Sequence, residues 1–482
     1  MVLLWVILIP LAGGVFLGAL GHRRWAFFAN IAFSAATALA ACVMTADVLR
    51  AGPLLALRQQ FFIDPLNVFL VDLTALVGLT TSIFSRSYMR VEDRLGHLTQ
   101  ARLRAYHAMY QLFLFTMLLA LTTNNIGVLW VAMEGATLST ALLVSLYRTP
   151  QGLAAAWKYI ILCGVGIALA LLGTILVYFA AHAVLGAGGA LLWTRLEAVK
   201  ARLDPAVMAV AFVFLVVGYG TKVGLVPLHN WLPDAHAEGP APISALLSGL
   251  LLNVALYAIV RFKALASGTP DAHWPAALMM GFGLVSVLVA TFSLGRQRDV
   301  KRLFAYSSIE HMGLATFAFG MGGPLANFAA LLHMTVHSLT KSSIFFTSGH
   351  VAQKAGTRDT QRIAGVMDSS PAAGWAFLLG GLAILGMPPF GVFASEFLIL
   401  TAAVHDAPWS VPLLILALGV AFATIFQATQ GMVFGASPGP RGSRDLALAP
   451  SFVHLALVLA LGLYIPHALA AWYAAAARLA GR

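Results

Sequence analysis

The sequence is dominated by long apolar runs that recur from its first residues to its last. A helix needs roughly 20 apolar residues to cross the hydrocarbon core of a bilayer, and many of the runs reach that length. Charged residues make up only 10% of the chain, against about 25% in a typical soluble domain. That is too few to cover the surface of a soluble protein of 482 residues. The runs therefore exclude an ordinary soluble enzyme and predict an all-α, polytopic protein in a lipid bilayer.

Polar residues, glycines and prolines divide the apolar runs into about fourteen predicted spans. The connections are short, so we expect a single membrane domain over residues 1–482. The spans are residues 3–20, 26–45, 64–84, 106–124, 126–146, 157–180, 206–228, 241–262, 275–294, 303–321, 326–350, 372–402, 410–433 and 450–473.

We interpret the net charge of +11 as a signal of orientation in the membrane and not as a sign of nucleic-acid binding. Seventeen Lys and Arg residues fall on one set of alternate loops and nine on the other. The side richer in positive charge is usually cytoplasmic, which predicts an inner-membrane protein with both termini on the outer, periplasmic side. The three remaining basic residues, Lys158, Lys222 and Lys341, lie within apolar spans.

Two spans are interrupted by prolines. The seventh runs into residues 222–234, which contain Pro227 and Pro233, and the twelfth contains Pro388 and Pro389. Proline removes a helix donor and clashes with the preceding turn. Broken backbone at membrane depth is tolerated only where it is buried in protein or lines a polar cavity. We therefore expect helices 7 and 12 to be broken near a functional site.

The positions of the two breaks suggest an internal repeat. Paired broken helices in two halves of a chain are typical of inverted-repeat transporters. In addition, Lys158 precedes Gly166 by eight residues in span six, and Lys341 precedes Gly349 by eight in span eleven. This order of features predicts two inverted five-helix repeats, helices 4–8 over residues 106–265 and helices 9–13 over residues 275–433.

Ionisable side chains within the spans are the candidate functional residues. A charge at the bilayer centre costs roughly 2.5–3.5 kcal/mol, so such residues are usually functional. A row of them predicts proton translocation. The candidates are Glu134, Lys158, Lys222, His229, Glu310, His311, His333, His337, Lys341 and Glu396.

Glu134 lies about two turns into the fifth span. Its carboxylate would hold a buried lysine, Lys158 or Lys222, in the charged form, and loss of the contact would let that lysine release its proton. The alternative is a structural ion pair that locks two helices.

His333, His337 and Lys341 are spaced by four residues, so they share one helix face along about 12 Å. Titratable groups in a row are suited to proton transfer, and the pKa of histidine is ordinarily near working pH. A zinc site and plain packing are the alternatives. We expect no metal or cofactor, because no Glu-x-x-His pattern is present and the two cysteines, Cys42 and Cys163, lie apart in apolar runs.

Glu310 and His311 are adjacent, so they point about 100° apart and should serve different partners. Glu396 follows the break in the twelfth span and could be the last acid on a proton path. It could instead cap the half-helix that begins there.

Two motifs resemble the antiporter-like subunits of respiratory complex I. They are the run from Lys222 through Pro227-Leu-His-Asn-Trp-Leu-Pro-Asp234 to Pro242, and Asp299-Val-Lys-Arg-Leu-Phe-Ala-Tyr-Ser-Ser308. The resemblance covers about residues 60–435 and extends to Mrp-type antiporters and membrane-bound hydrogenases. Residues 307–313 and 156–162 are most similar to component F of hydrogenase-4-type complexes.

The resemblance implies a fourteen-helix subunit with a hydrated axis through the membrane centre. By position, Glu134 matches the family's fifth-helix acid, Lys158 its sixth-helix lysine and Lys222 its seventh-helix lysine. Lys341 matches the central lysine and Glu396 the exit residue. One departure is Ser248, which stands where many members have a histidine on the eighth helix.

These features favour a proton-translocating subunit of a redox-driven, hydrogenase-4-type or complex I-like assembly. Its expected partners are antiporter-like and quinone-site-like membrane subunits and a peripheral redox arm, with no nucleic acid. Redox centres and catalytic residues would then lie in the partners. Alternatives are an Mrp-type Na⁺/H⁺ antiporter subunit without redox coupling and a purely structural membrane subunit.

Overall fold

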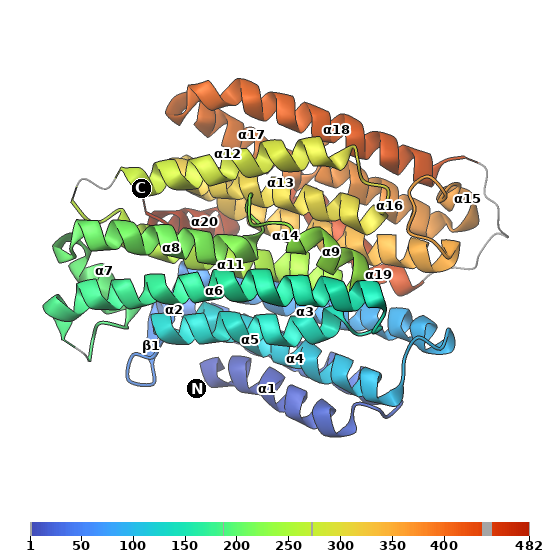
Figure 1. The fold of residues 1–482 in the computed structure, drawn as a ribbon, viewed down its shortest axis with the longest axis horizontal. Coiled ribbons are helices and arrows are strands. Elements are labelled where there is room, and N and C mark those ends of the chain that lie inside the picture. The colour runs from blue at the N-terminus through green and yellow to red at the C-terminus, as the bar shows by residue number, and fades with distance from the viewer. Residues whose placement is uncertain (1, 187, 271–272, 436–445, 482) are drawn as a thin grey trace.

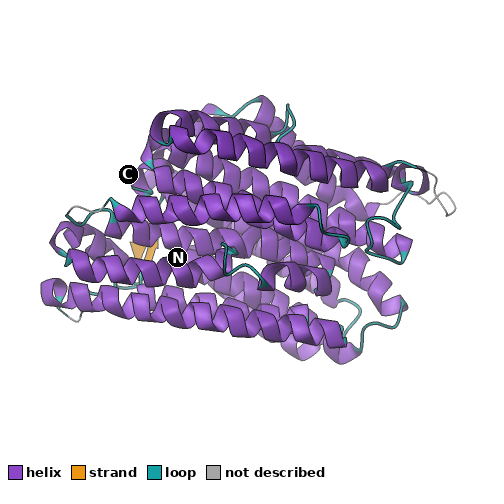
Figure 2. Ribbon diagram, turned by 45° about the horizontal axis from the view of Figure 1, so that its top comes forward, coloured by secondary structure: helices purple, strands orange, loops and turns teal. Residues whose placement is uncertain are grey.

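The computed structural model describes residues 2–186, 188–270, 273–435 and 446–481. Three of the arginines counted in the loop charges lie outside the described residues, namely Arg441, Arg444 and Arg482. The described part is almost entirely helical, and its helices lie side by side along the long axis of the molecule (Figures 1 and 2). Eleven of its helical segments are long and apolar enough to cross a membrane. The predicted all-α, polytopic fold is confirmed.

The N-terminal part consists of four long helices and a short hairpin. The hairpin pairs its two strands antiparallel, with Leu54 opposite Ile63 and Ala56 opposite Phe61. The elements are α1 (Val2–Leu20), α2 (Ala26–Ala51), β1 (Leu54–Ala56), β2 (Phe61–Ile63), α3 (Pro65–Arg94) and α4 (Gln100–Thr122).

The middle part contains the first broken helix. Its elements are α5 (Ile126–Val144), α6 (Pro150–Leu185), α7 (Trp193–Val199), η1 (Lys200–Arg202), α8 (Pro205–Val223), α9 (Trp231–Glu238), α10 (Ala241–Leu246), the π-helical turn η2 (Leu247–Leu251) and α11 (Leu252–Ala266). Every residue of α10, η2 and α11 is buried, so these elements form the centre of the protein.

The C-terminal part contains the second broken helix and the long helix α14. Its elements are α12 (Trp274–Leu294), α13 (Val300–Met321), α14 (Gly323–Ala355), α15 (Val366–Ser369), α16 (Pro371–Ile384), α17 (Gly391–Asp406), η3 (Pro408–Ser410), α18 (Val411–Val433), η4 (Leu446–Leu448), α19 (Ala449–Leu463) and α20 (His467–Leu479). Helix α14 packs against α13, α16, α17, α19 and α20, which surround it.

Several helices begin where a polar side chain precedes a proline. The Asp64 carboxylate accepts hydrogen bonds from the backbone N–H groups of Leu66 and Asn67, both at 3.0 Å. Thr149 caps α6 and Asp204 caps α8 in the same way, each followed by proline. The cap satisfies N–H groups that have no partner within the helix, and proline lacks the N–H that would otherwise need one.

Both predicted helix breaks are confirmed. Helix α8 ends at Val223, the next residue, Gly224, adopts φ = 84°, and α9 begins at Trp231. The second break separates α16, which ends at Ile384, from α17, which begins at Gly391. The prolines therefore divide each span into two helices, as their chemistry requires.

The prediction that residues 450–473 form one span was wrong. Helix α19 ends at Leu463, the chain is extended at Tyr464, and α20 begins at His467. Pro466 stands between the two helices and cannot supply the N–H that a continuous helix needs.

Candidate functional site

Lys222 and Glu134 are connected through a third residue. Lys222 is fully buried in the last turn of α8, and its Nζ donates a hydrogen bond to Oγ1 of Thr137 on α5. The Thr137 hydroxyl in turn donates to Oε2 of Glu134 at 3.2 Å. The carbonyl end of α8 also favours a cation at this position. The predicted pair thus exists, but as a three-residue chain.

Lys158 is not buried, contrary to the prediction. Its side chain is 42% exposed and its Nζ donates to Oδ2 of Asp234 at 2.7 Å. Arg302 also pairs with Asp234. The exposure of Lys158 could not be predicted from the apolar run around it, because the exposed face of a membrane helix is as apolar as its packed face.

His229 lies in the segment between α8 and α9, beside the break. Its side chain is buried, with Nδ1 unpartnered, and its ring centroid is 6.2 Å from that of Tyr306 on α13. It thus lies between the broken helix and α13, but no hydrogen bond links it to Lys222 in the described structure.

Lys341 is fully buried near the middle of α14. Its Nζ donates to the Phe304 carbonyl oxygen at 3.0 Å and lies 5.6 Å from the centre of the Phe304 ring. Glu310 on α13 is also buried. The Lys341 ammonium thus has a neutral carbonyl oxygen and a ring face beside it rather than an ion-pair partner among the described residues.

The neighbouring histidines lie on the same face of α14, as their spacing predicts, and both are fully buried. His333 shares a 3.1 Å hydrogen bond with His311 of α13 and a 2.9 Å bond with Ser395 of α17. The His337 ring lies 5.6 Å from the His311 ring, and neither of its nitrogens has a partner. Three helices thus contribute to one histidine cluster.

Glu396 completes this cluster at the second helix break. Its Oε1 lies 3.8 Å from Nδ1 of His311. Its other oxygen packs so closely on Gly386 that a Cβ there would lie 2.1 Å away, and Gly386 has φ = 64°. Only glycine suits that conformation and that contact. His311 bonds to His333, and a separate partner for the adjacent Glu310 stays a prediction.

Two serine hydroxyls lead to the carbonyl oxygen that Lys341 binds. Ser248, on the π-helical turn, bonds to Ser308 of α13 at 2.8 Å. Ser308 donates to the Phe304 carbonyl at 2.9 Å, the same oxygen that Lys341 binds. Single π-turns inside helices are frequent at functional sites.

Thr137, Ser308 and Ser395 were missed by the sequence analysis. All three are small hydroxyl residues in apolar helices, which usually serve packing. The one available signal was spacing, since Thr137 follows Glu134 by three residues and Ser395 directly precedes Glu396. Among the described residues, no group of three or more His, Cys, Asp or Glu side chains is arranged to hold a metal ion.

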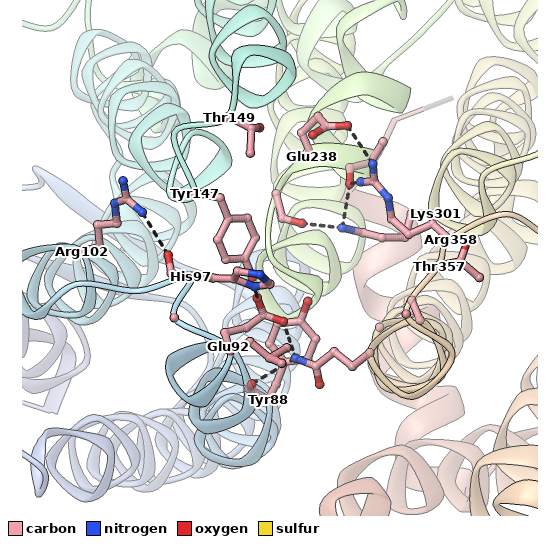
Figure 3. A pocket seen from close by; sticks show the side chains of 18 residues that line it. Tyr88, Glu92, His97, Arg102, Tyr147, Thr149, Glu238, Lys301, Thr357 and Arg358 are labelled. Carbon is pink, nitrogen blue, oxygen red and sulfur yellow. Dashed lines mark hydrogen bonds and ion pairs between the residues drawn. The ribbon is translucent and has the colours of Figure 1, made fainter. Parts of the chain in front are cut away.

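A surface pocket of about 590 Å³ opens at one end of the helix bundle (Figure 3). Its lining comes from α3, α9, α13 and α14 and the nearby loops. Within it, Glu92 pairs with His97 at 2.8 Å and Arg358 pairs with Glu238 at 3.1 Å. Lys301 lines it as well.

Comparisons with known proteins place this arrangement in context. Residues 123–425 match the family described as NADH:quinone oxidoreductase/Mrp antiporter, transmembrane. The chain is 51% identical to the hydrogenase-4 component F homolog of Methylacidiphilum infernorum over 414 residues, which cover 86% of this chain and 87% of that one.

Two solved structures have the same fold. A chain of the archaeal membrane-bound sulfane sulfur reductase has a TM-score of 0.90 at 24% identity, covering 99% of this chain and 97% of that one. A chain of respiratory complex I from Thermus thermophilus has a TM-score of 0.82 at 24% identity, with both chains fully covered.

Proposed function

Since the chain belongs to the NADH:quinone oxidoreductase/Mrp antiporter membrane family, we propose that it translocates protons as an antiporter-like subunit of a redox-driven complex of hydrogenase-4 or complex I type. The observation that carries this proposal is a set of ionisable groups within the membrane helices, near both helix breaks. A hydroxyl links Glu134 to the buried Lys222, Lys341 is buried on α14, and a histidine cluster reaches Glu396 at the second break.

The geometry supports a division of roles along this series. Glu134 holds a positive charge on Lys222 through Thr137, so a charge arriving near Glu134 would change how firmly Lys222 keeps its proton. Lys341, whose ammonium donates to a neutral carbonyl and lies over a ring, would accept and release the proton in transit. We assign the step from Lys341 to Glu396 to the histidine cluster, because His337 lies one turn from Lys341 on α14 and His311 lies 3.8 Å from Glu396, where a proton would leave.

Several further features belong to the proposal. The two broken helices lie in units of residues 106–265 and 275–433, which we propose are inverted repeats, each supplying one break to the shared axis. Both termini would lie on the outer side of the inner membrane. Lys158 stands apart from the central series, paired with Asp234.

The redox chemistry of the complex would reside in other subunits. The relative with 51% identity is named a hydrogenase-4 component F homolog, and this name supports a redox-coupled assembly. We propose membrane partners of antiporter-like and quinone-site-like type and a peripheral redox arm. Affinity purification through a tag on this chain, followed by mass spectrometry, would identify them.

An Mrp-type Na⁺/H⁺ antiporter subunit is the second candidate, since the matching family includes Mrp antiporters. The two proposals differ in what drives the ion. The test uses vesicles that hold the purified assembly, without an electron donor or acceptor. If the second candidate is right, an imposed Na⁺ gradient would move protons in these vesicles. Under the first, protons would move only during redox turnover.

The direct test compares redox turnover with proton movement in the purified complex reconstituted in vesicles. Lys222→Ala and Glu134→Gln should abolish the share of coupled proton movement that this chain carries and leave electron transfer largely intact. Unchanged proton movement in both variants would contradict the proposal.

A further inference from the structure

The end of α19 packs directly against the second helix break. At Gly462, in the last turn of α19, an added Cβ would collide with the carbonyl oxygen of Pro389. It would also lie 2.5 Å from the carbonyl carbon of Phe390 and 2.6 Å from the backbone nitrogen of Gly391. All three are backbone atoms, which no rotamer change can move aside. Helix α19 therefore contacts the break backbone to backbone, and this contact requires glycine.

Gly391, the first residue of α17, is the second glycine of this contact. An added Cβ there would lie 2.7 Å from Cγ1 of Val336 on α14 and 3.0 Å from the carbonyl oxygen of Val458 on α19. Carbon atoms pack best at about 3.5–4.0 Å. The start of α17 thus lies between α14 and α19 without room for a side chain, and the two glycines fix where α17 begins.

The start of α17 matters because its second turn carries two groups of the proposed proton exit. Ser395 and Glu396 follow Gly391 by four and five residues, about 6–8 Å along the helix axis. Ser395 bonds to His333 at 2.9 Å, and Oε1 of Glu396 lies 3.8 Å from Nδ1 of His311. A displacement of the first turn of α17 would therefore change both distances.

The other half of the broken span, α20, holds the facing helix. The hydroxyl groups of Tyr473 on α20 and Thr335 on α14 share a 2.6 Å hydrogen bond. Asn327, in the first turns of α14, donates to the carbonyl oxygen of Ala477 at 3.0 Å. The break at residues 464–466 thus lets α19 contact the start of α17 while α20 binds α14, so one span supports both sides of the histidine cluster.

We propose that Gly462 and Gly391 are positioning residues for proton exit. They hold the start of α17 close to α14 and α19, and thereby set the distances of Ser395 and Glu396 from the histidine cluster. Proton transfer needs donor and acceptor within hydrogen-bond reach, so a side chain at either glycine would slow it. This inference rests on the proposed function, because the groups that the glycines position are its proton exit.

The test measures proton movement per electron pair in the complete complex reconstituted in vesicles. A displacement of about 1 Å can slow a reaction by about 100-fold. We therefore expect Gly462→Ala and Gly391→Ala to lower the proton movement that this chain carries by about tenfold or more. Gly419→Ala on α18 is the matched control, because an added Cβ there meets no atom of the described residues within 4 Å. It should behave as wild type.

A second-site variant keeps the test decisive if a glycine variant assembles poorly. The nearest atom to an added Cβ at Gly391 belongs to the side chain of Val336, so Val336→Ala should restore much of what Gly391→Ala loses. The same change should not rescue Gly462→Ala, because the three atoms nearest to its added Cβ are all backbone. A double variant no better than Gly391→Ala, or equal rescue of both glycine variants, would overturn the inference.

Infrared spectroscopy shows whether the glycines act through Glu396. The bands of its carboxyl group are those that Glu396→Gln removes from the redox-induced difference spectrum of the complex. We expect Gly462→Ala to shift these bands, because the distance from the carboxyl group to His311 would change, and Gly419→Ala to leave them in place. Unchanged bands in an assembled Gly462→Ala complex with impaired proton movement would show a merely structural role and overturn the inference.

These outcomes are distinct from failure of the proposed function. Wild-type proton movement in an assembled Gly462→Ala complex, with loss of this chain's contribution in Lys222→Ala, would overturn the positioning role and leave the proposed function standing. Wild-type proton movement in Lys222→Ala would overturn the proposed function, and the positioning role with it.

Discussion

Lys222 reaches the carboxylate of Glu134 through the hydroxyl of Thr137, which accepts from the ammonium and donates to the acid. A direct ion pair would be hard to open, because separating two buried charges is costly. A hydroxyl bridge can rotate, so it lets the two charges influence each other without holding them in contact. The bridge suits a pair whose coupling must change during each cycle.

Removing the bridging hydroxyl should weaken this coupling. Thr137→Val keeps the shape of the side chain but leaves the Lys222 ammonium without its hydrogen-bond acceptor, a loss of about 1–3 kcal/mol. We expect redox-driven proton movement to fall by about tenfold or more. Thr137→Ser, which keeps the hydroxyl, should stay close to wild type. Equal activity of the Val and Ser variants in reconstituted vesicles would show that the bridge is dispensable.

The hydrogen bond between Ser248 and Ser308 should matter for transfer toward Lys341. Ser308→Ala removes both this bond and the bond to the Phe304 carbonyl, so we expect proton movement to slow several-fold. Ser307 is the control, because it is fully buried and its hydroxyl has no partner. Stopped-flow measurement of proton release should distinguish the two alanine variants, and identical traces would exclude the serine link.

Gly386 should be required for the position of Glu396. An alanine there would face a positive φ, at a cost of about 1–2 kcal/mol, and its Cβ would collide with the carboxylate. We expect Gly386→Ala to lower both the Tm of the purified protein and proton movement. Gly281→Ala, in an open position on α12, should leave Tm unchanged or slightly raised. A Gly386→Ala protein with wild-type proton movement would show that Glu396 tolerates displacement.

Lys158 should contribute little to translocation. Its pair with Asp234 is half-exposed, and Arg302 continues to neutralise the acid when Lys158 is removed. Such pairs contribute about 0–1 kcal/mol, so Lys158→Ala should move protons within about fivefold of wild type. Complete loss of proton movement, with assembly intact, would place Lys158 on the path after all.

Much of the fold could be predicted from the sequence because its main determinants are local. Apolar run length indicates a membrane helix, a polar residue before proline marks where α6 and α8 begin, and prolines within a span mark both breaks. The common face of His333, His337 and Lys341 follows from helical spacing alone. The error at residues 464–466 has the same origin, because Pro466 was read as part of an apolar run.

The contacts between helices could not be predicted in this way. The roles of Thr137, Ser308 and Ser395 depend on the residues of other helices that their hydroxyls contact. The sequence of their own helices does not specify those contacts. The burial of Lys158 was predicted wrongly because an apolar run does not show which of its faces packs inward.

The central claim is that protons cross this chain through Lys341. The most direct measurement is the number of protons moved per electron pair by the complete complex in sealed vesicles, compared between wild type and Lys341→Ala at equal redox turnover. We predict that the ratio falls in the variant by the number of protons that this chain moves per electron pair, while electron transfer continues. An unchanged ratio at equal turnover would contradict the claim.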